Sequence, residues 1–514
     1  MDRRRFIVFG AAGGIAVLTG CGGGAGGAGM PATGTAPPPV NPPVNPPVAN
    51  PPPATPPVSP LTVGQPLADL VRLANTSATP GVFAATLTAQ RASKSMLPDA
   101  STEFWTYNAL VPGPLIDVFE GDTVRIRLEN RLSQETTVHW HGLPVPPEQD
   151  GNPMDPVAPG ATRLYEFTLP VGSAGTYWYH PHPHELTAEQ VFRGMAGLFI
   201  VRSRTDPVPA AIEEKLLVIS DLRLAADGSI PANTAMDWQN GREGDYLLVN
   251  GQNKPTLAIR PGQSQRWRIL NATNARYLRL GLTGHTFTLI GTHGGLLQSP
   301  LPGLNEILLA PAERAEIVVT AGLAAGASAV LQSLPYDRGT MGMMGSTSST
   351  VPLLTLNYTS AAAPAIALPS VLNSIAGLGK PTATKRLVLS SGMGAGGMGG
   401  GMMGFLIDGK TFDPGRVDLT SRVNEVEQWV IENRSSMDHP FHLHGTQFQV
   451  VSRTRGGITA PEPFLAWRDT VNVAASESVA FNVVQSQPGK RMYHCHILEH
   501  EDQGMMGVLE VVPA

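Results

Sequence analysis

The stretch TVRIRL, at residues 123–128, alternates strictly between polar and apolar side chains. Because successive side chains of a β-strand point to opposite faces, this alternation predicts a strand with one buried face. Residues 163–169 and 266–269 follow the same period, and clusters of Gly, Pro, Asn and Asp, the usual turn formers, separate such runs. We therefore expect an all-β protein made of sandwich domains, with one short helix near residues 188–195.

The chain of 514 residues is longer than a domain with a single hydrophobic core, so we expect several domains. Three turn-rich blocks follow one another, and each is about the size of one β-sandwich. We place these domains at residues 67–203, 204–360 and 384–514, with a linker rich in Ala and Pro at 361–383. The formal net charge of −5 gives no reason to expect a nucleic-acid partner.

The first 21 residues have the composition of an export signal. Arginines at positions 3–5 precede an apolar run of about a dozen residues, shorter than the roughly 20 that span a bilayer. The arginines resemble a twin-arginine signal, and LTGC at 18–21 resembles a bacterial lipobox with Cys21 as the acylated residue. We expect a periplasmic or cell-surface protein held to a membrane by a lipid on Cys21. The alternative is an ordinary cleaved signal with an incidental cysteine.

A linker is expected over residues 22–66. Gly and Ala fill 22–29, and Pro dominates 31–60, a composition that cannot bury a core. The Pro-rich part should be an extended polyproline II spacer. The chain has two cysteines, and since Cys21 belongs to the signal, we expect no disulfide with Cys495.

Ten of the 13 histidines lie in four short clusters in the first and third blocks. The clusters are His139 with His141, His180 with His182, His439 with His442 and His444, and His494 with His496 and His500. In an H-x-H pair on a strand both imidazoles lie on one face, about 6.7 Å apart along the chain. Four such pairs give eight imidazoles, which is more than one local site needs. This number fits a cluster of three copper ions held between two domains.

Cys495 lies between two of these histidines, so its side chain must point away from theirs. Together with His500 and Met505 it forms a loop of metal ligands at regular spacing. An upstream His439 completes a site of two histidines, one cysteine and a weak axial methionine, the blue-copper arrangement. A few covalent bonds would then link this site to the cluster.

All four motifs resemble those of the multicopper oxidase family, which includes laccases, bilirubin oxidases and bacterial cuprous oxidases. The resemblance runs from about Leu67 to the C-terminus, in the family's motif order. It implies three cupredoxin-like Greek-key β-sandwich domains, with the second as a spacer. It also implies four copper ions, one of type 1, one of type 2 and two of type 3. The implied reaction passes electrons from Cu(I) or a phenolic donor to O2, which is reduced to water.

The resemblance assigns each ligand, by position, to one copper ion. His439, Cys495, His500 and Met505 are expected at the type 1 copper, and His139 and His442 at the type 2 copper. His141, His180 and His496 are expected at one type 3 copper, and His182, His444 and His494 at the other. His184, His285 and His293 lie outside the pattern. We expect structural roles for His285 and His293, although His293 stands where similar proteins usually have aspartate.

Asp150 and Glu501 are candidate proton donors. Asp150 follows the first histidine cluster, and Glu501 follows His500. Reduction of O2 to water consumes four protons per turnover, so a buried cluster needs an acid relay. Both positions match acidic residues to which similar oxidases assign that role. The alternative is that both are ordinary loop charges.

Methionines gather at 341–344 and 393–403, and Met437 precedes His439 by two residues. Thioethers are soft ligands suited to Cu(I). Similar cuprous oxidases carry a methionine-rich insertion at the place of the second group and a methionine matching Met437. Here the insertion is short and lacks histidine, and Ser435 stands where those enzymes have aspartate. A flexible loop with incidental methionines is the alternative.

Other classes of function fit less of this pattern. A copper-storage or electron-carrier protein would not need the ligands of a three-metal cluster. A two-domain nitrite reductase lacks this cluster and is shorter, and a non-catalytic family member has typically lost ligands, whereas all are present here. A laccase-like phenol oxidase without a role in copper homeostasis would differ from a cuprous oxidase in its donor, and the sequence leaves both donors open.

Overall fold

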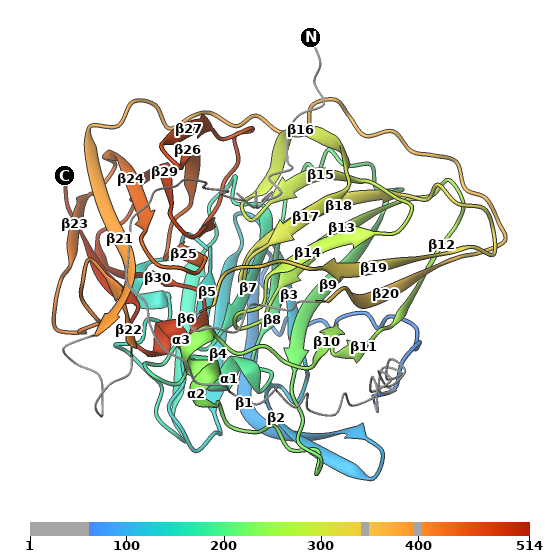
Figure 1. Ribbon diagram of the computed structural model, residues 1–514, viewed down its shortest axis with the longest axis horizontal. Helices are drawn as coiled ribbons and strands as arrows, with labels where there is room; N and C mark the ends of the chain where they lie inside the picture. Colours follow the sequence, from blue (N-terminus) through green and yellow to red (C-terminus); the bar gives the residue numbers. More distant parts are fainter. Residues whose placement is uncertain (1–60, 341–348, 394–402) are drawn as a thin grey trace, which may run out of the picture. The chain divides into compact units, whose positions relative to one another are not determined.

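The computed structural model describes residues 61–340, 349–393 and 403–514. Strands dominate this part of the chain and form six sheets, which pair into three successive sandwiches (Figure 1). Each sandwich has its own core of aliphatic and aromatic side chains. The expected all-β fold of three cupredoxin-like domains is confirmed. The expected signal at 1–21 and most of the expected linker lie outside the described residues.

The first sandwich contains two four-stranded sheets, in the orders β2-β1-β4-β6 and β3-β8-β7-β5. Its strands are β1 (Val82–Leu97), β2 (Ala100–Tyr107), β3 (Gly113–Phe119), β4 (Thr123–Asn130), β5 (His139–His141), β6 (Thr162–Thr168), β7 (Gly175–His180) and β8 (Gly197–Arg202). The expected strand at 123–128 is β4. Its Val124, Ile126 and Leu128 are fully buried and the arginines between them are exposed, as the alternation predicts.

The second sandwich packs a seven-stranded sheet, β11-β10-β9-β13-β18-β15-β16, against a five-stranded sheet, β12-β20-β19-β14-β17. Its strands are β9 (Glu213–Leu222), β10 (Tyr246–Val249), β11 (Gln252–Asn253), β12 (Thr256–Ile259), β13 (Ser264–Asn271), β14 (Leu278–Leu282), β15 (Phe287–Thr292), β16 (Gly295–Leu304), β17 (Glu306–Leu309), β18 (Arg314–Thr320), β19 (Ser328–Leu334) and β20 (Val351–Tyr358). The expected strand at 266–269 lies in β13, but both of its faces are buried. Arg266 and Arg268 lie on the face opposite the core, where they pair with Glu316 of β18, Glu214 and Asp206.

The third sandwich joins a six-stranded sheet, β22-β21-β24-β29-β26-β27, to a five-stranded sheet, β23-β31-β30-β25-β28. Its strands are β21 (Ala383–Met393), β22 (Met403–Ile407), β23 (Leu419–Arg422), β24 (Val426–Asn433), β25 (His439–Leu443), β26 (Phe448–Arg455), β27 (Ile458–Pro461), β28 (Thr470–Val473), β29 (Glu477–Val484), β30 (Gly489–Cys495) and β31 (Met506–Val512). The neighbouring strands β25 and β30 carry His439, His442 and His494, and His444 and His496 follow directly after their ends.

The helices of the described residues are short: η1 (Pro147–Gln149), α1 (Thr187–Phe192), α2 (Ala235–Asn240) and α3 (Leu498–Asp502). The helix expected near 188–195 is α1, which ends early because Gly194 turns the chain with a φ of +119°. Although α1, α2 and α3 come from three different sandwiches, α1 and α2 both contact α3 (Figure 1). No helix of the described residues is long and apolar enough to cross a membrane.

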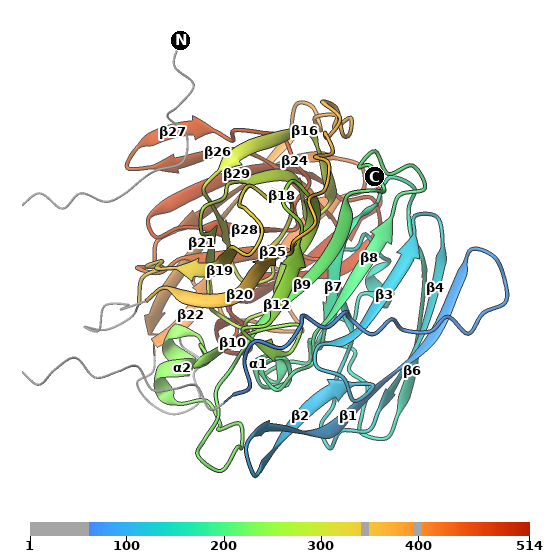
Figure 2. The same cartoon turned by 90° about the vertical axis from the view of Figure 1, so that its right-hand side faces the viewer.

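The first and second sandwiches share a buried apolar interface. Trp178 of β7 and Leu198 of β8 pack against Val218 of β9, and Figure 2 shows these strands near one another. Every residue of β7 is buried, because one of its faces meets its own core and the other meets the second sandwich. Removing this apolar surface from water stabilises the docking of the two sandwiches.

Parts of both expected linkers pack on the second sandwich. The Gly64 N–H donates to the carbonyl oxygen of Lys254 at 3.0 Å, so the last residues of the expected linker at 22–66 are hydrogen-bonded to the second sandwich. Residues 361–383 carry a strand only from Ala383 onward, where β21 begins. Leu372 in this stretch packs in one apolar cluster with residues of β15 and β18. The domain boundaries given above stay predictions.

Candidate metal centre

Two antiparallel strand pairs bring the histidines together. β5 pairs with β7 so that His139 lies opposite His180, and β25 pairs with β30 so that His442 lies opposite His494. The remaining members of the H-x-H pairs follow two residues later in each motif: His141, His182, His444 and His496. All eight side chains are fully buried.

Each H-x-H pair places its rings side by side, as neighbours on one strand face should lie. The ring centroids are 5.5 Å apart in His139 and His141, 6.0 Å in His180 and His182, 5.0 Å in His442 and His444, and 5.5 Å in His494 and His496. Rings of the first and third sandwiches also interleave. His141 stacks on His442, and His139 on His444, each with centroids 3.8 Å apart. The eight rings therefore form one cluster between two sandwiches.

Nitrogen atoms of different rings in this cluster converge on one another. The Nε2 atoms of His139 and His442 are 3.3 Å apart, and Nε2 of His494 lies 3.2 Å from that of His182 and 3.0 Å from that of His444. Other ring nitrogens are buried without any hydrogen-bond partner, among them Nδ1 of His141, Nε2 of His180 and both nitrogens of His496. A shared cation satisfies these lone pairs, so the residues fit a multinuclear copper site.

The opposite nitrogens of several rings are anchored, which fixes the rings. Nδ1–H groups donate to main-chain carbonyl oxygens: His139 to Asp150 at 3.0 Å, His180 to Pro181 at 2.9 Å, His442 to Asp469 at 2.8 Å and His494 to Cys495 at 3.0 Å. Such outer bonds select the tautomer and turn the free nitrogen toward a metal.

Burial keeps the rings in the form that binds metals. It lowers the pKa of His180, His182 and His444 well below the usual range, and nearby imidazoles add to this effect. The same causes act on His442 and His496. A histidine with a lowered pKa stays neutral at neutral pH and offers a lone pair.

A second constellation lies within the third sandwich. Sγ of Cys495, at the end of β30, is 3.3 Å from Nδ1 of His439 and 4.0 Å from Nδ1 of His500. The Cys495 N–H donates to the carbonyl oxygen of Met505 at 3.1 Å, and Met505 is fully buried in the same core. Burial raises the pKa of the Cys495 thiol, so the thiolate requires a metal to be stable there. The four residues expected at the type 1 copper are thus together.

The two imidazoles of this constellation are covered. His439 and His500 have no exposed surface. The Phe405 ring stacks on His500 with centroids 3.6 Å apart, and the Ser435 hydroxyl lies 2.8 Å from Nε2 of His439. Burial, together with the cationic Arg338 nearby, lowers the pKa of His439 to about 3.

Three sequence models described as multicopper oxidase match residues 88–206, 220–358 and 381–514. The chain belongs to the multicopper oxidase family. A multicopper oxidase of Staphylococcus aureus is 33% identical over 443 residues, which cover 83% of this chain and 88% of that protein. The cell division protein FtsP of Photorhabdus laumondii is 30% identical over 452 residues, 83% of this chain and 89% of its own. A solved multicopper oxidase of Campylobacter jejuni, described as a metallo-oxidase, has a TM-score of 0.83 and 42% identity, and covers 88% of this chain and 96% of its own.

In this multicopper oxidase, both carboxylates expected to deliver protons contact the cluster histidines. Oδ2 of Asp150 lies 2.8 Å from Nδ1 of His444, and burial raises the pKa of Asp150. Oε2 of Glu501 lies 3.1 Å from Nδ1 of His494, and its Oε1 lies 3.4 Å from Nδ1 of His182. Burial alone would raise the pKa of Glu501, but these two imidazoles lower it to about 2. The acids therefore differ: Asp150 retains its proton to higher pH, and Glu501 is ionised.

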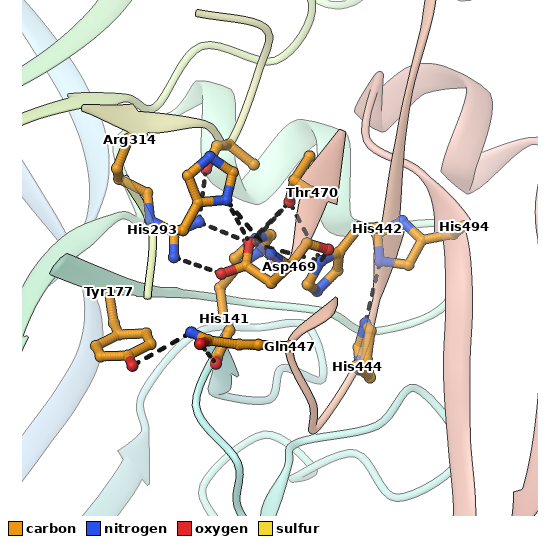
Figure 3. Close-up of polar contacts among 12 residues, drawn as sticks. His141, Tyr177, His293, Arg314, His442, His444, Gln447, Asp469, Thr470 and His494 are labelled. Carbon is orange, nitrogen blue, oxygen red and sulfur yellow. Dashed lines mark hydrogen bonds and ion pairs between the residues drawn. The ribbon is translucent and has the colours of Figure 1, made fainter. Parts of the chain in front are cut away.

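The second sandwich, expected to be a spacer, supplies none of the candidate metal ligands among the described residues, but it contacts the cluster through a carboxylate. Arg314, at the start of β18, donates from both terminal nitrogens to Asp469, at 2.7 and 2.6 Å (Figure 3). Asp469 in turn lies 3.1 Å from Nε2 of His141. His293, for which a structural role was expected, lies with its Nδ1 3.3 Å from the same carboxylate. Asp469 and Arg314 were not singled out from the sequence, because 155 residues separate them and neither belongs to a motif.

The remaining candidates lie apart from the cluster or outside the described residues. The partly exposed His184 ring packs edge-on against Phe412, with centroids 4.9 Å apart, and His285 bonds to the Tyr358 hydroxyl at the surface of the second sandwich. Met437 is fully buried in the core that holds Cys495. The methionines at positions 341, 343, 344, 398 and 402 lie outside the described residues.

Proposed function

We propose that this multicopper oxidase takes single electrons at a type 1 copper and uses four of them to reduce O2 to water at a trinuclear copper cluster. In each cycle four donors lose one electron each, and O2 gains four electrons and four protons to give two molecules of water. One observation carries the proposal. Cys495 joins the mononuclear constellation, while its chain neighbours His494 and His496 belong to the histidine cluster.

The chain provides a short path for electrons between the two sites. Cys495 is covalently bonded to His494, and the His494 Nδ1–H also donates to the Cys495 carbonyl oxygen at 3.0 Å. Copper, when bound, supplies the one-electron carriers at both ends of this path. The protein supplies neutral imidazoles, a thiolate position and a dry interior, since all of these side chains are fully buried.

Asp150 and Glu501 are proposed to manage the protons. Asp150, whose pKa is raised by burial, lies beside His444 and is the proposed proton donor. Glu501 is ionised beside His182 and His494 and accepts protons that arrive from outside. The pKa of the adjacent Asp502 is raised well above its usual range by burial and by the charge of Glu501.

The ligand set argues against the competing functions. A copper carrier or store needs only the constellation at Cys495, whereas eight further histidines converge between two sandwiches. The relative named as a cell division protein raises a structural role as the second candidate. A purely structural role does not explain buried, unpartnered ring nitrogens in His141, His180 and His496.

Oxygen uptake separates these functions. Copper-loaded protein should consume O2 with a one-electron donor, and protein stripped of copper should not. Cu(I), a phenol and a synthetic dye should each be tested. Copper-loaded protein that is blue but consumes no O2 with any of them would favour a carrier or a structural role.

For the donor, we propose Cu(I), with phenols as the alternative. In the described part of the chain, His439 and His500 are fully buried, and Phe405 covers His500. An organic donor therefore has no direct contact with either imidazole. The described flanks of both methionine-rich segments lie at this site. Gly339, before the first segment, abuts the Ser436 carbonyl, and Phe405 follows the second. The similar multicopper oxidase from C. jejuni is described as a metallo-oxidase, which agrees with this proposed donor.

Replacing sulfur while keeping side-chain size tests the donor. Leucine at positions 393, 398, 402 and 403 should raise the KM for Cu(I) and leave phenol oxidation unchanged, because the methionine thioether binds Cu(I) and the leucine side chain does not. The same replacements at 341, 343 and 344 give the matched set for the other segment. Unchanged Cu(I) oxidation with impaired phenol oxidation would favour a laccase-like enzyme.

We also propose that the protein is exported and anchored by a lipid on Cys21, outside the described residues. The support is the sequence of residues 1–21. Cys21→Ser should move the protein from the membrane to the soluble fraction of cells. If the variant and the wild type fractionate alike, the anchor is wrong.

A further inference from the structure

All three sandwiches meet at one buried carboxylate, that of Asp469 (Figure 3). It precedes β28 in the third sandwich, Arg314 reaches it from the second, and His141 from the first. Gly142, which follows His141, is packed so closely that a Cβ there would lie 2.2 Å from Oδ2 of Asp469 and 3.0 Å from Nη2 of Arg314. The first sandwich therefore closes tightly over this ion pair.

Asp469 forms hydrogen bonds with two cluster histidines, one through its side chain and one through its main chain. Oδ1 of its side chain accepts the Nε2–H of His141 at 3.1 Å, and its main-chain carbonyl oxygen accepts the Nδ1–H of His442 at 2.8 Å. The Thr470 hydroxyl donates to Oδ1 at 2.9 Å. The rings of His141 and His442 lie stacked 13° from parallel. One residue thus sets the orientation of two rings assigned to different copper ions.

Arg314 holds this carboxylate in place. Its terminal nitrogens bind both oxygens of Asp469, and its Nε–H donates to the carbonyl oxygen of Thr176 in β7 at 2.7 Å. His293 completes the enclosure from the second sandwich, since its Nδ1 accepts the main-chain N–H of Asp469 at 3.4 Å. Burial and the neighbouring Arg314 lower the pKa of His293 to about 4, so this ring is neutral and serves as an acceptor.

We propose that Asp469 and Arg314 are positioning residues of the copper cluster, through which the second sandwich orients His141 and His442. The inference rests on the proposed function, because it concerns the ligands of the cluster that function requires. Arg314 is not proposed to bind substrate or metal. It acts through Asp469, and Asp469 acts through the two rings.

The strand β18 offers a matched control. Glu316, two residues after Arg314, is a buried carboxylate held by Arg266 and Arg268. It shares the strand, burial and ion pairing of the proposed network but bonds to none of the cluster histidines among the described residues. Glu316→Gln therefore measures what the loss of a buried charge costs the fold alone.

The experiment compares Asp469→Asn, Arg314→Lys and Glu316→Gln in the full-length, copper-loaded protein. Copper per chain, the blue absorption, the electron paramagnetic resonance signal of the type 2 copper and the melting temperature of metal-free protein are measured for each. Removing a partner of a metal-binding histidine typically costs about 10–100-fold in metal affinity or activity. Asp469→Asn and Arg314→Lys should keep the blue absorption, show an altered type 2 signal and lose copper affinity at the cluster by that order.

Glu316→Gln should keep a wild-type type 2 signal even where its melting temperature falls as far as that of Arg314→Lys. The proposal is overturned if both network variants retain wild-type cluster copper and signal, or if Glu316→Gln changes the signal in proportion to its lost stability. If either Asp469→Asn or Arg314→Lys does not fold, the copper content and the type 2 signal of the other variant test the proposal. Wild-type protein without a type 2 signal would instead reject the proposed function.

Discussion

The two metal sites differ in how much of the chain each one needs. The mononuclear constellation draws its ligands from residues 439–505 of the third sandwich alone, with Cys495 and His500 in consecutive elements, β30 and α3. The cluster draws rings from the first and third sandwiches and is held by Arg314 of the second. The first site therefore needs one folded domain, whereas the second needs three domains docked in register.

The enclosure of the two sites differs as well. Phe405, in the middle of β22, stacks its aromatic ring on His500 of the mononuclear constellation. The cluster is surrounded by ionisable side chains that bond to its histidines, among them Asp150, Glu501 and Asp469. This contrast matches a division of labour in which electrons enter at one site and protons are consumed at the other.

The largest effect is expected from Cys495→Ser, because this residue connects the two sites. Loss of the thiolate should abolish the blue absorption and reduce turnover with every donor to background. Absorption spectra and oxygen uptake of the copper-loaded variant provide the check. A variant that stays blue and active would refute the assignment of Cys495.

His442→Ala should separate the sites. His442 bonds within the cluster and makes no bond to Cys495 among the described contacts, so the blue absorption should remain while turnover falls by about 100-fold or more. Circular dichroism controls for folding. Loss of colour together with activity in a folded variant would contradict the division of ligands.

Asp150→Asn and Glu501→Gln should slow turnover without releasing copper, by roughly 100-fold if the proton steps become limiting. Wild-type turnover should fall as pH rises through the raised pKa of Asp150, because the acid loses the proton that it delivers. Asp150→Asn cannot ionise, so its slower turnover should lose this dependence. Turnover rates of the wild type and both variants between pH 4 and 8 test this prediction. If both variants turn over at the wild-type rate across that range, the proton relay is excluded.

A smaller effect is expected on the stability of copper-free protein. Burial lowers the pKa of His496 and of most other cluster rings, so they stay neutral when folded but take up protons near pH 6.5 when unfolded. The unfolded state then binds more protons, and the free energy of unfolding falls with pH below about 6.5, by up to about 1.4 kcal/mol per pH unit for each ring. Urea unfolding at several pH values measures this slope, which His496→Gln should reduce by about one proton. Stability that is constant from pH 7 to 5 would contradict these pKa shifts.

The sequence predicts the strands and the ligands because both follow local periods. Residues 123–128 alternate with period two, and the H-x-H motifs use the same period to place two rings on one face. Chemically distinctive side chains at short spacing are thus visible without the fold.

What the sequence does not predict depends on contacts between residues that lie far apart in the chain. Arg266 and Arg268 follow the alternation of an exposed face, yet they are buried, and Glu316 on the neighbouring strand, Glu214 and Asp206 pair with them. Asp469 and Arg314 are single charged residues without a motif, and only the packed sandwiches make them partners. Interdomain ion pairs leave no periodic trace in a sequence.

The most direct test of the central claim is the ratio of electrons to oxygen. An oxygen electrode, combined with spectroscopic counting of the oxidised donor and an assay for hydrogen peroxide, gives this ratio for copper-loaded protein. We expect four donor electrons per O2 consumed and no accumulating peroxide. Two electrons per O2 with an equal yield of peroxide, or no oxygen uptake at all, would contradict reduction of O2 to water at a trinuclear cluster.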